Sequence, residues 1–189
     1  MAVNQTTPET FYVPATPHSP NSTLPVVVYR NALADRSYEA AIEILQSNQW
    51  IKGGRCLLLL RTTMPPLTRR TPSYGTGTYL LGKSPLDADF DKHGNAVGVK
   101  FVARPGDVFA WPAGVTHFVT DTQDDYEIIG FYALTGFNTV EEPYDMEYAL
   151  DSEEETAKKR EMCERVPGPE FDPVYGKEGS MPKLWKRTG

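Results

Sequence analysis

The stretch RPGDVFAWPAGVTHFVTD, residues 104–121, decides the fold. Pro105-Gly106-Asp107 is a turn-forming group, and it is followed by an apolar run that ends at Trp111. A second turn, at residues 112–114, returns the chain into a run that carries His117. Because side chains alternate across a strand, Val115, His117 and Val119 are predicted to share one face. The stretch therefore predicts two short strands with one histidine on the inner side.

Similar short runs continue on both sides of this stretch. Predicted strands cover Leu24–Tyr29, Cys56–Arg61, Thr76–Leu81, Val97–Ala103, Asp107–Trp111, Val115–Thr120 and Glu127–Leu134. Two helices are predicted. Asp35–Trp50 has apolar residues at helical spacing, with Asp35 or Ser37 as its cap and Gly53-Gly54 after its end. Ser152–Arg165 has an acidic start and basic later residues, and a weak apolar stripe that is typical of a surface helix. Many short strands with few helices predict a β-sandwich or barrel.

The spacing of Gly106, Pro112, Gly114 and His117 resembles the second motif of the cupin (RmlC-like) superfamily, although Asp121 stands where the family pattern usually has Asn. The segments PNSTLPVVVYR (20–30), IIGFYA (128–133) and DPVYGKEG (172–179) are similar to the YjlB-like single-domain subfamily. The resemblance implies an all-β fold: a single cupin (jelly-roll) β-barrel with an N-terminal helix and a C-terminal surface helix. It divides the chain into an extended arm (1–24), a barrel that includes helix 35–50 (25–150), and a C-terminal helix and tail (151–189).

The resemblance also includes fungal cupin-domain oxidoreductases of polyketide gene clusters that make salicylaldehyde-type aromatics. It implies an oxidoreductase, or a related small-molecule enzyme, of fungal aromatic polyketide biosynthesis. The alternative is a non-catalytic, metal-free cupin that binds a small molecule or assists partner enzymes, because fold does not determine function.

His117 occupies a family metal-ligand position and is the single metal-ligand candidate of this sequence. The first family motif would place its other ligands near Arg61, Thr63 and Thr68, but residues 56–75 contain no His, Asp or Glu. A divalent transition metal is therefore expected only if that motif is restored, and no cofactor otherwise. Without a metal, His117 is a candidate general acid or base, or a hydrogen-bonded structural histidine.

Residues 55–74 are anomalous in a second way, because no acidic residue occurs from Ile44 to Leu86 in a chain with 25 Asp and Glu. The segment is a genuine sequence, a decayed site or the product of a gene-model error. Sequencing of the transcript distinguishes the last explanation from the others.

Other candidates have ordinary structural interpretations. Asp87, Asp89 and Asp91 alternate as in a calcium loop but lack its closing Glu, so a solvated hairpin loop is predicted. Arg61, Arg69 and Arg70 are expected on a solvated loop, with attraction of an anionic ligand as the alternative. A further group of aromatic residues belongs either to the core or to the lining of a cavity for a flat substrate. These aromatic residues are Phe109, Trp111, Phe118, Phe131 and Tyr132.

Composition limits the partners. The 189 residues carry a net charge of −6, which argues against a general nucleic-acid-binding protein. No apolar run approaches 18 residues and no signal peptide is recognisable, so no membrane association is expected. Cys56 and Cys163 are too few for a disulfide framework, and a cytoplasmic location is expected. The expected partner is a small-molecule substrate. The resemblance also implies a possible homodimer through Pro25–Arg30.

Overall fold

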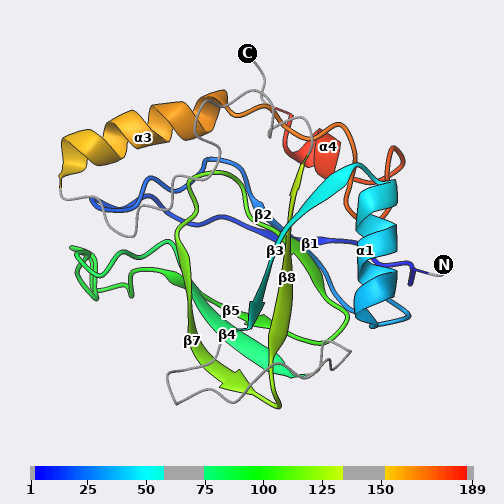
Figure 1. Cartoon of the computed structure of the whole chain (residues 1–189). Helices are drawn as coiled ribbons and strands as arrows, with labels where there is room; N and C mark the ends of the chain where they lie inside the picture. The colour runs from blue at the N-terminus through cyan, green and yellow to red at the C-terminus, as the bar shows by residue number, and fades with distance from the viewer. Residues whose placement is uncertain (1–2, 58–74, 134–151, 187–189) are drawn as a thin grey trace.

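The computed structural model describes residues 3–57, 75–133 and 152–186, with the side chains of 53–57 excepted. Eight strands and three helices occur in these ranges (Figure 1). The strands are β1 (Glu9–Phe11), β2 (Val26–Tyr29), β3 (Trp50–Leu57), β4 (Thr76–Leu81), β5 (Val99–Ala103), β6 (Val108–Ala110), β7 (His117–Gln123) and β8 (Glu127–Ala133). The helices are α1 (Tyr38–Ser47), α3 (Glu153–Arg165) and α4 (Met181–Leu184).

All strand pairs that the structure describes are antiparallel. They form three small sheets, ordered β1-β2-β6, β3-β8 and β5-β4-β7. The prediction of a β-rich chain with few helices is confirmed at this level. No helix among the described residues has the length and apolar character that crossing a membrane requires.

The sheet β1-β2-β6 separates two apolar cores, which explains why β2 reads Val-Val-Val-Tyr without a polar residue. Val27 and Tyr29 face a core that α1, Trp50 and the C-terminal tail complete. Val26 and Val28 face the second core, built mainly from β4 and β5. Figure 1 shows α1 beside β3 and β8, with α3 at the other side of the view. Burial on both faces is what makes a continuous apolar strand favourable here.

The first predicted helix is shorter than its periodicity indicated. Ser37, and not Asp35, caps α1, since its hydroxyl accepts from the Ala40 amide at 3.3 Å. The helix ends at Ser47, because Gln49 takes a positive φ of 62° and turns the chain into β3. The extension to Trp50 was therefore wrong. Gly53-Gly54 do not follow a helix but lie within β3, where the pairing with β8 is irregular between Lys52 and Gly54.

The predicted strand ranges agree with the structure more closely than the predicted end of the first helix does. The prediction for β4 is confirmed at both ends, and β5, β6, β7 and β8 lie within or overlap their predicted ranges. The predicted strand Cys56–Arg61 is described only at its first two residues, which end β3. The second helix is confirmed as α3, and the Ser152 hydroxyl caps it by accepting from the Glu155 amide at 3.2 Å.

The predicted solvated loop between β4 and β5 contains one buried carboxylate. Asp87 is 7% exposed and accepts hydrogen bonds from the Thr16 hydroxyl at 2.7 Å and from the Ser84 amide at 2.8 Å. It also accepts from the His18 amide and the Ser19 hydroxyl, so it fastens the N-terminal arm to this loop. The prediction of a solvated residue was wrong for Asp87, because its partners Thr16, His18 and Ser19 lie some 70 residues earlier in the chain. It holds for the exposed residues Asp89 and Asp91.

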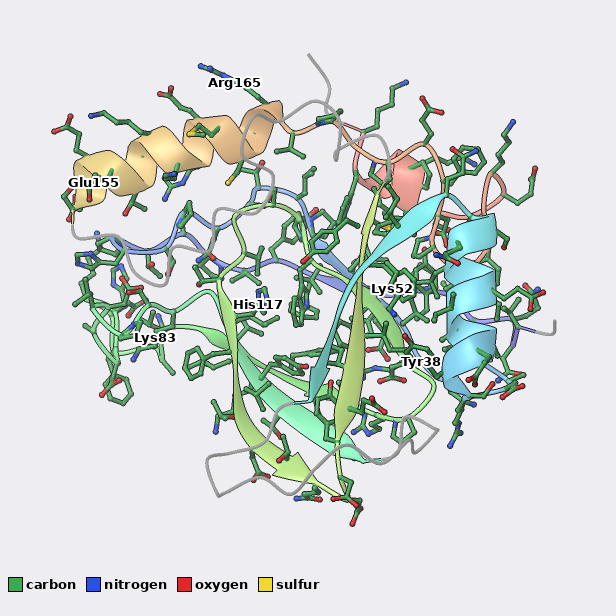
Figure 2. The ribbon with its side chains drawn as sticks, viewed as in Figure 1. Tyr38, Lys52, Lys83, His117, Glu155 and Arg165 are labelled. Carbon is green, nitrogen blue, oxygen red and sulfur yellow. The ribbon has the colours of Figure 1, made fainter. Side chains whose placement is uncertain are left out.

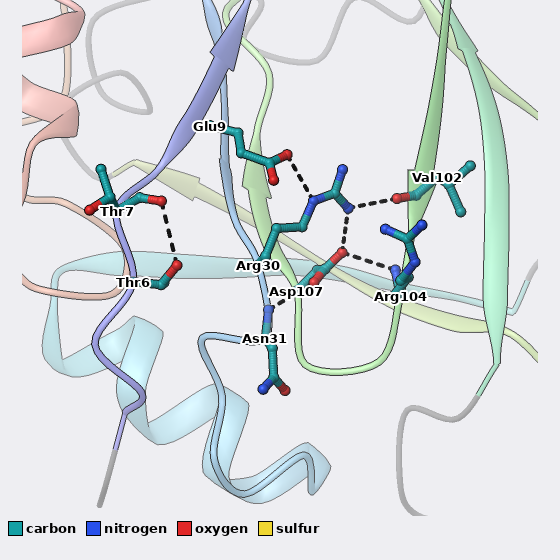
Figure 3. A network of polar contacts seen from close by, with 8 residues as sticks. All are labelled: Thr6, Thr7, Glu9, Arg30, Asn31, Val102, Arg104 and Asp107. Atoms are coloured by element: carbon teal, nitrogen blue, oxygen red, sulfur yellow. Dashed lines mark hydrogen bonds and ion pairs between the residues drawn. The ribbon is translucent and has the colours of Figure 1, made fainter.

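A polar network centred on Arg30 fastens the turn of the RPGD segment to the rest of the fold (Figure 3). The guanidinium donates to the Asp107 carboxylate at 2.7 Å, to the Val102 carbonyl at 2.7 Å and to Glu9 at 3.0 Å. Asp107 also accepts from the Asn31 and Arg104 amides. One buried carboxylate therefore connects the end of β2 to the turn before β6.

The segment Pro25–Arg30, through which the resemblance implies a homodimer, contains β2 in the interior of a sheet. This strand pairs with β1 along one edge and with β6 along the other. Its residues Val26–Tyr29 are fully buried. The homodimer through this segment stays a prediction.

Candidate functional site

His117 lies on the inner face of the sheet β5-β4-β7. In the pairing of β7 with β4, His117 lies opposite Leu81 and Val119 opposite Tyr79, and both β4 residues are almost fully buried. Phe118 lies opposite Leu80, and its side chain is exposed on the outer face. Figure 2 shows His117 at the start of β7, on the side of that strand toward β3 and β8 in this view. The predicted alternation along this strand is confirmed.

The turn before β7 fixes where His117 begins the strand. Gly114 has φ +90°, and the Val115 amide donates to the Pro112 carbonyl at 3.2 Å. The Thr116 carbonyl accepts from the Gly82 amide at 2.7 Å, which joins this turn to the end of β4. A side chain at position 114 would meet the Cys163 sulfur of α3 at 2.9 Å. The glycine is therefore required both by the backbone conformation and by the close approach of α3.

The hydrogen bond of the imidazole determines its tautomer. His117 Nδ1 lies 3.1 Å from the backbone carbonyl oxygen of Val115. A carbonyl oxygen only accepts, so Nδ1 carries the proton, and Nε2 of the neutral ring presents a lone pair. Nε2 has no hydrogen-bond partner among the described residues. The ring thus offers one free acceptor atom.

Protein atoms packed around the imidazole favour its neutral form. Burial lowers the pKa of His117 below its usual value of 6.5, and the hydrogen bond to Val115 acts in the opposite direction. By its accessible surface, however, His117 is an exposed residue, like its neighbour Phe118. The neutral ring is therefore both populated near neutral pH and open to a ligand.

An aromatic cluster surrounds the other side of the ring. The indole of Trp111 lies against His117, with ring centroids 4.1 Å apart and an interplanar angle of 42°. Trp111 in turn contacts Phe109 at 5.0 Å and Tyr79 at 5.1 Å. Phe101 completes the group. These rings form an apolar environment on the Trp111 side of the imidazole.

Trp111 differs from the other two tryptophans in its N–H group. Trp50 Nε1 donates to the Phe171 carbonyl and Trp185 Nε1 to the Pro25 carbonyl. Trp111 Nε1 is buried without an acceptor in the part of the chain that the structure describes. A buried, unpaired donor costs free energy, about 1–3 kcal/mol. Because this nitrogen is itself inaccessible, it is not a group that a ligand beside His117 reaches in this structure.

Sequence reasoning identified only part of this cluster. Of its five aromatic candidates, Phe109 and Trp111 lie in the cluster, whereas Phe118 faces outward and Phe131 packs against the other core. Tyr132 shares a face of β8 with Ile128 and is 42% exposed. Tyr79 and Phe101 were missed, although alternation along β4 and β5 was the signal that could have found them.

The residues present do not fit the transition-metal site of the family. In residues 3–57, 75–133 and 152–186, no three His, Cys, Asp or Glu side chains come together as a donor set. His93 lies in an exposed turn and His18 in the N-terminal arm. The positions near Arg61, Thr63 and Thr68, like Arg69 and Arg70, lie outside the described residues. Their side chains supply no imidazole or carboxylate.

Neither of two cavities elsewhere in the described part is lined by His117. An open cleft of about 580 Å³ lies between the arm, α1 and the tail, with Thr6, Glu43 and Tyr175 among its lining residues. A smaller cavity of about 130 Å³ lies between α1 and the strands β6 and β8. No histidine is among the lining residues of the larger cleft, so it lacks the acid–base group that the histidine–aromatic cluster offers. We therefore place the candidate site at His117.

Acidification is expected to destabilise the protein through His117. Because the folded state holds its pKa below 6.5, the unfolded chain takes up this proton first as the pH falls. The stability contribution is complete above pH 6.5 and is lost as the pH falls toward the folded pKa. Urea unfolding at pH 7.5, 6.5 and 5.5 should show a steeper loss for the wild type than for His117→Asn. Parallel losses in the two proteins would contradict the burial of a neutral imidazole.

No family model, curated protein or solved structure matches this chain. The functional assignment therefore rests on the residues of the chain and on their geometry.

Proposed function

We propose that this chain is a cupin-type protein with a jelly-roll barrel that binds a small planar molecule on the inner face of β5-β4-β7. His117 acts on the bound molecule as a general acid or base. The antiparallel sheets and the inward position of His117 support this proposal. So does the resemblance of residues 104–121 to the second cupin motif.

One observation carries the proposal: His117 packs against Trp111, has its Nδ1 atom bound to the Val115 carbonyl, and has no described residue as partner of its Nε2 atom. A neutral imidazole held in one tautomer is oriented to accept a proton from a ligand and to return it. Positioned proton transfer of this kind contributes rate factors of about 10²–10⁴. The aromatic cluster would hold a flat ligand by stacking.

The biological setting is proposed from the resemblance. We place the chain with fungal cupin-domain oxidoreductases of aromatic polyketide biosynthesis, whose flat products suit an aromatic cluster. To the described residues we assign only binding and proton transfer. A transition metal would require the missing first motif, because His117 alone does not form a donor set.

The second candidate is a metal-free cupin that binds a small molecule without catalysis or assists partner enzymes. The absence of His, Asp and Glu from residues 56–75 favours it. Measuring the metal content of the purified protein distinguishes the oxidoreductase from the metal-free binding or accessory protein. Stoichiometric transition metal that is lost in His117→Ala supports the oxidoreductase, whereas a folded, metal-free protein supports the accessory role.

Ligand binding at His117 is tested directly with aromatic phenols and aldehydes as probes. A probe present at 100 times its Kd should stabilise the folded protein by about 2.7 kcal/mol and raise its melting temperature. His117→Ala should weaken binding, whereas His93→Ala, in an exposed turn, should not. Binding that is equal in both variants, or absent in the wild type, would contradict the proposed site.

A further inference from the structure

We propose that the His117 site selects planar ligands that carry a hydroxyl proton, such as phenols and enols, over the matching ethers and carboxylate anions. This inference rests on the proposed function, because it names the ligand class of the same site. The selectivity follows from the hydrogen-bonding atoms and charges at the site, and not from the shape of the site.

The hydrogen-bond acceptor of the site is Nε2 of His117. The Val115 carbonyl retains the proton of His117 on Nδ1, so Nε2 presents a lone pair to a ligand. A lone pair binds a donor. A hydroxyl group supplies that donor, whereas an ether oxygen offers only further lone pairs, which repel Nε2.

The charge of the surroundings argues against an anion. The described residues placed against His117 and Trp111 are Leu81, Val115, Phe109 and Tyr79, and none is cationic. The guanidinium of Arg30 lies over Phe101 at 5.2 Å, but it already pairs with the Asp107 and Glu9 carboxylates. Among the described residues at this position, a carboxylate would therefore lose its hydration without gaining a counter-ion.

The proton-transfer step balances within the site. The ligand O–H bond breaks, a bond from that proton to Nε2 forms, and the O–H electron pair stays on the oxygen as a phenolate or enolate. The imidazolium keeps its Nδ1–H bond to the Val115 carbonyl throughout. Return of the proton restores the starting state, so no oxidant or reductant takes part.

The test uses three probes of the same ring system: 2-naphthol, 2-methoxynaphthalene and 2-naphthoate. Dissociation constants are measured at pH 7.5 by calorimetry with the full chain. We expect 2-naphthol to bind about tenfold more tightly than either of the others. In His117→Asn, the side-chain amide can still donate to Val115 but lacks the Nε2 acceptor. Its affinity for 2-naphthol should fall about tenfold, while that for the ether changes less than twofold.

The controls separate this inference from the function on which it rests. His93→Asn makes the same substitution in an exposed turn and should bind all three probes as the wild type does. If 2-naphthol and its ether bind equally, or 2-naphthoate binds best, the selectivity is wrong although a binding site exists. If none of the probes binds, the proposed function fails as well. A melting transition of His117→Asn that matches the wild type ensures that lost affinity is not lost folding.

Discussion

Replacement of Asp172 with alanine is expected to lower the free energy of unfolding by about 3–5 kcal/mol. Asp172 is fully buried, and its carboxylate accepts from the Tyr29 hydroxyl and from the amides of Val174, Tyr175 and Met181. Truncation leaves these four donors without an acceptor in a water-excluded region. It also removes the connection between β2 and the C-terminal tail, whose Met181 and Trp185 complete the core beside α1.

Tyr29→Phe is the matched variant, because it removes one of the four donors and leaves the carboxylate. Burial, and then the hydrogen bond to Asp172, raise the pKa of the Tyr29 phenol above its usual value, so the hydroxyl remains a donor at neutral pH. This variant should cost about 1–2 kcal/mol. Urea unfolding followed by circular dichroism measures both. If Asp172→Ala costs no more than Tyr29→Phe, the carboxylate does not hold the tail as its geometry indicates.

Asp172 also shows where prediction from sequence stops. The sequence predicts a tail after the C-terminal helix, and in the described residues this tail consists largely of turns and one short helix. However, the partner of Asp172 lies 143 residues away in β2, and no local pattern indicates such a pair. Asp87 is similar, since alternating aspartates predict a solvated loop until the N-terminal arm supplies its donors. Buried polar groups depend on tertiary contacts, which periodicity does not report.

In the candidate site, too, local features could be predicted from the sequence, whereas features that depend on tertiary contacts could not. Period-2 alternation was enough to place His117 and Val119 on the inner face, because strand geometry is local. The tautomer of His117 could not be predicted, since it depends on the turn that brings the Val115 carbonyl to Nδ1. The helix boundary at Ser47 also required the fold: Trp50 is buried with its N–H on the Phe171 carbonyl, and this contact favours β3 over a longer helix.

Replacement of Asp107 with alanine is expected to cost about 2–3 kcal/mol of unfolding free energy. The side chain is 3% exposed and accepts from Arg30 at 2.7 Å and from the backbone amides of Asn31 and Arg104 (Figure 3). Its loss leaves the Arg30 guanidinium without its buried partner. The expected cost is below that of a fully buried pair because the Arg30 side chain is 28% exposed.

Arg30 provides its own control, because it pairs with a second carboxylate in a different environment. Glu9 lies 3.0 Å from the guanidinium, but its side chain is 58% exposed. Glu9→Gln should therefore cost less than about 1 kcal/mol, and high salt should reduce that cost further. A double-mutant cycle of Asp107→Ala with Arg30→Met measures the buried pair alone. If the coupling between Asp107 and Arg30 is no larger than that between Glu9 and Arg30, then the backbone amides, and not the ion pair, account for the burial of Asp107. In that case Asp107→Asn should still lose stability, though less than Asp107→Ala, because its single acceptor oxygen serves either the Asn31 or the Arg104 amide but not both.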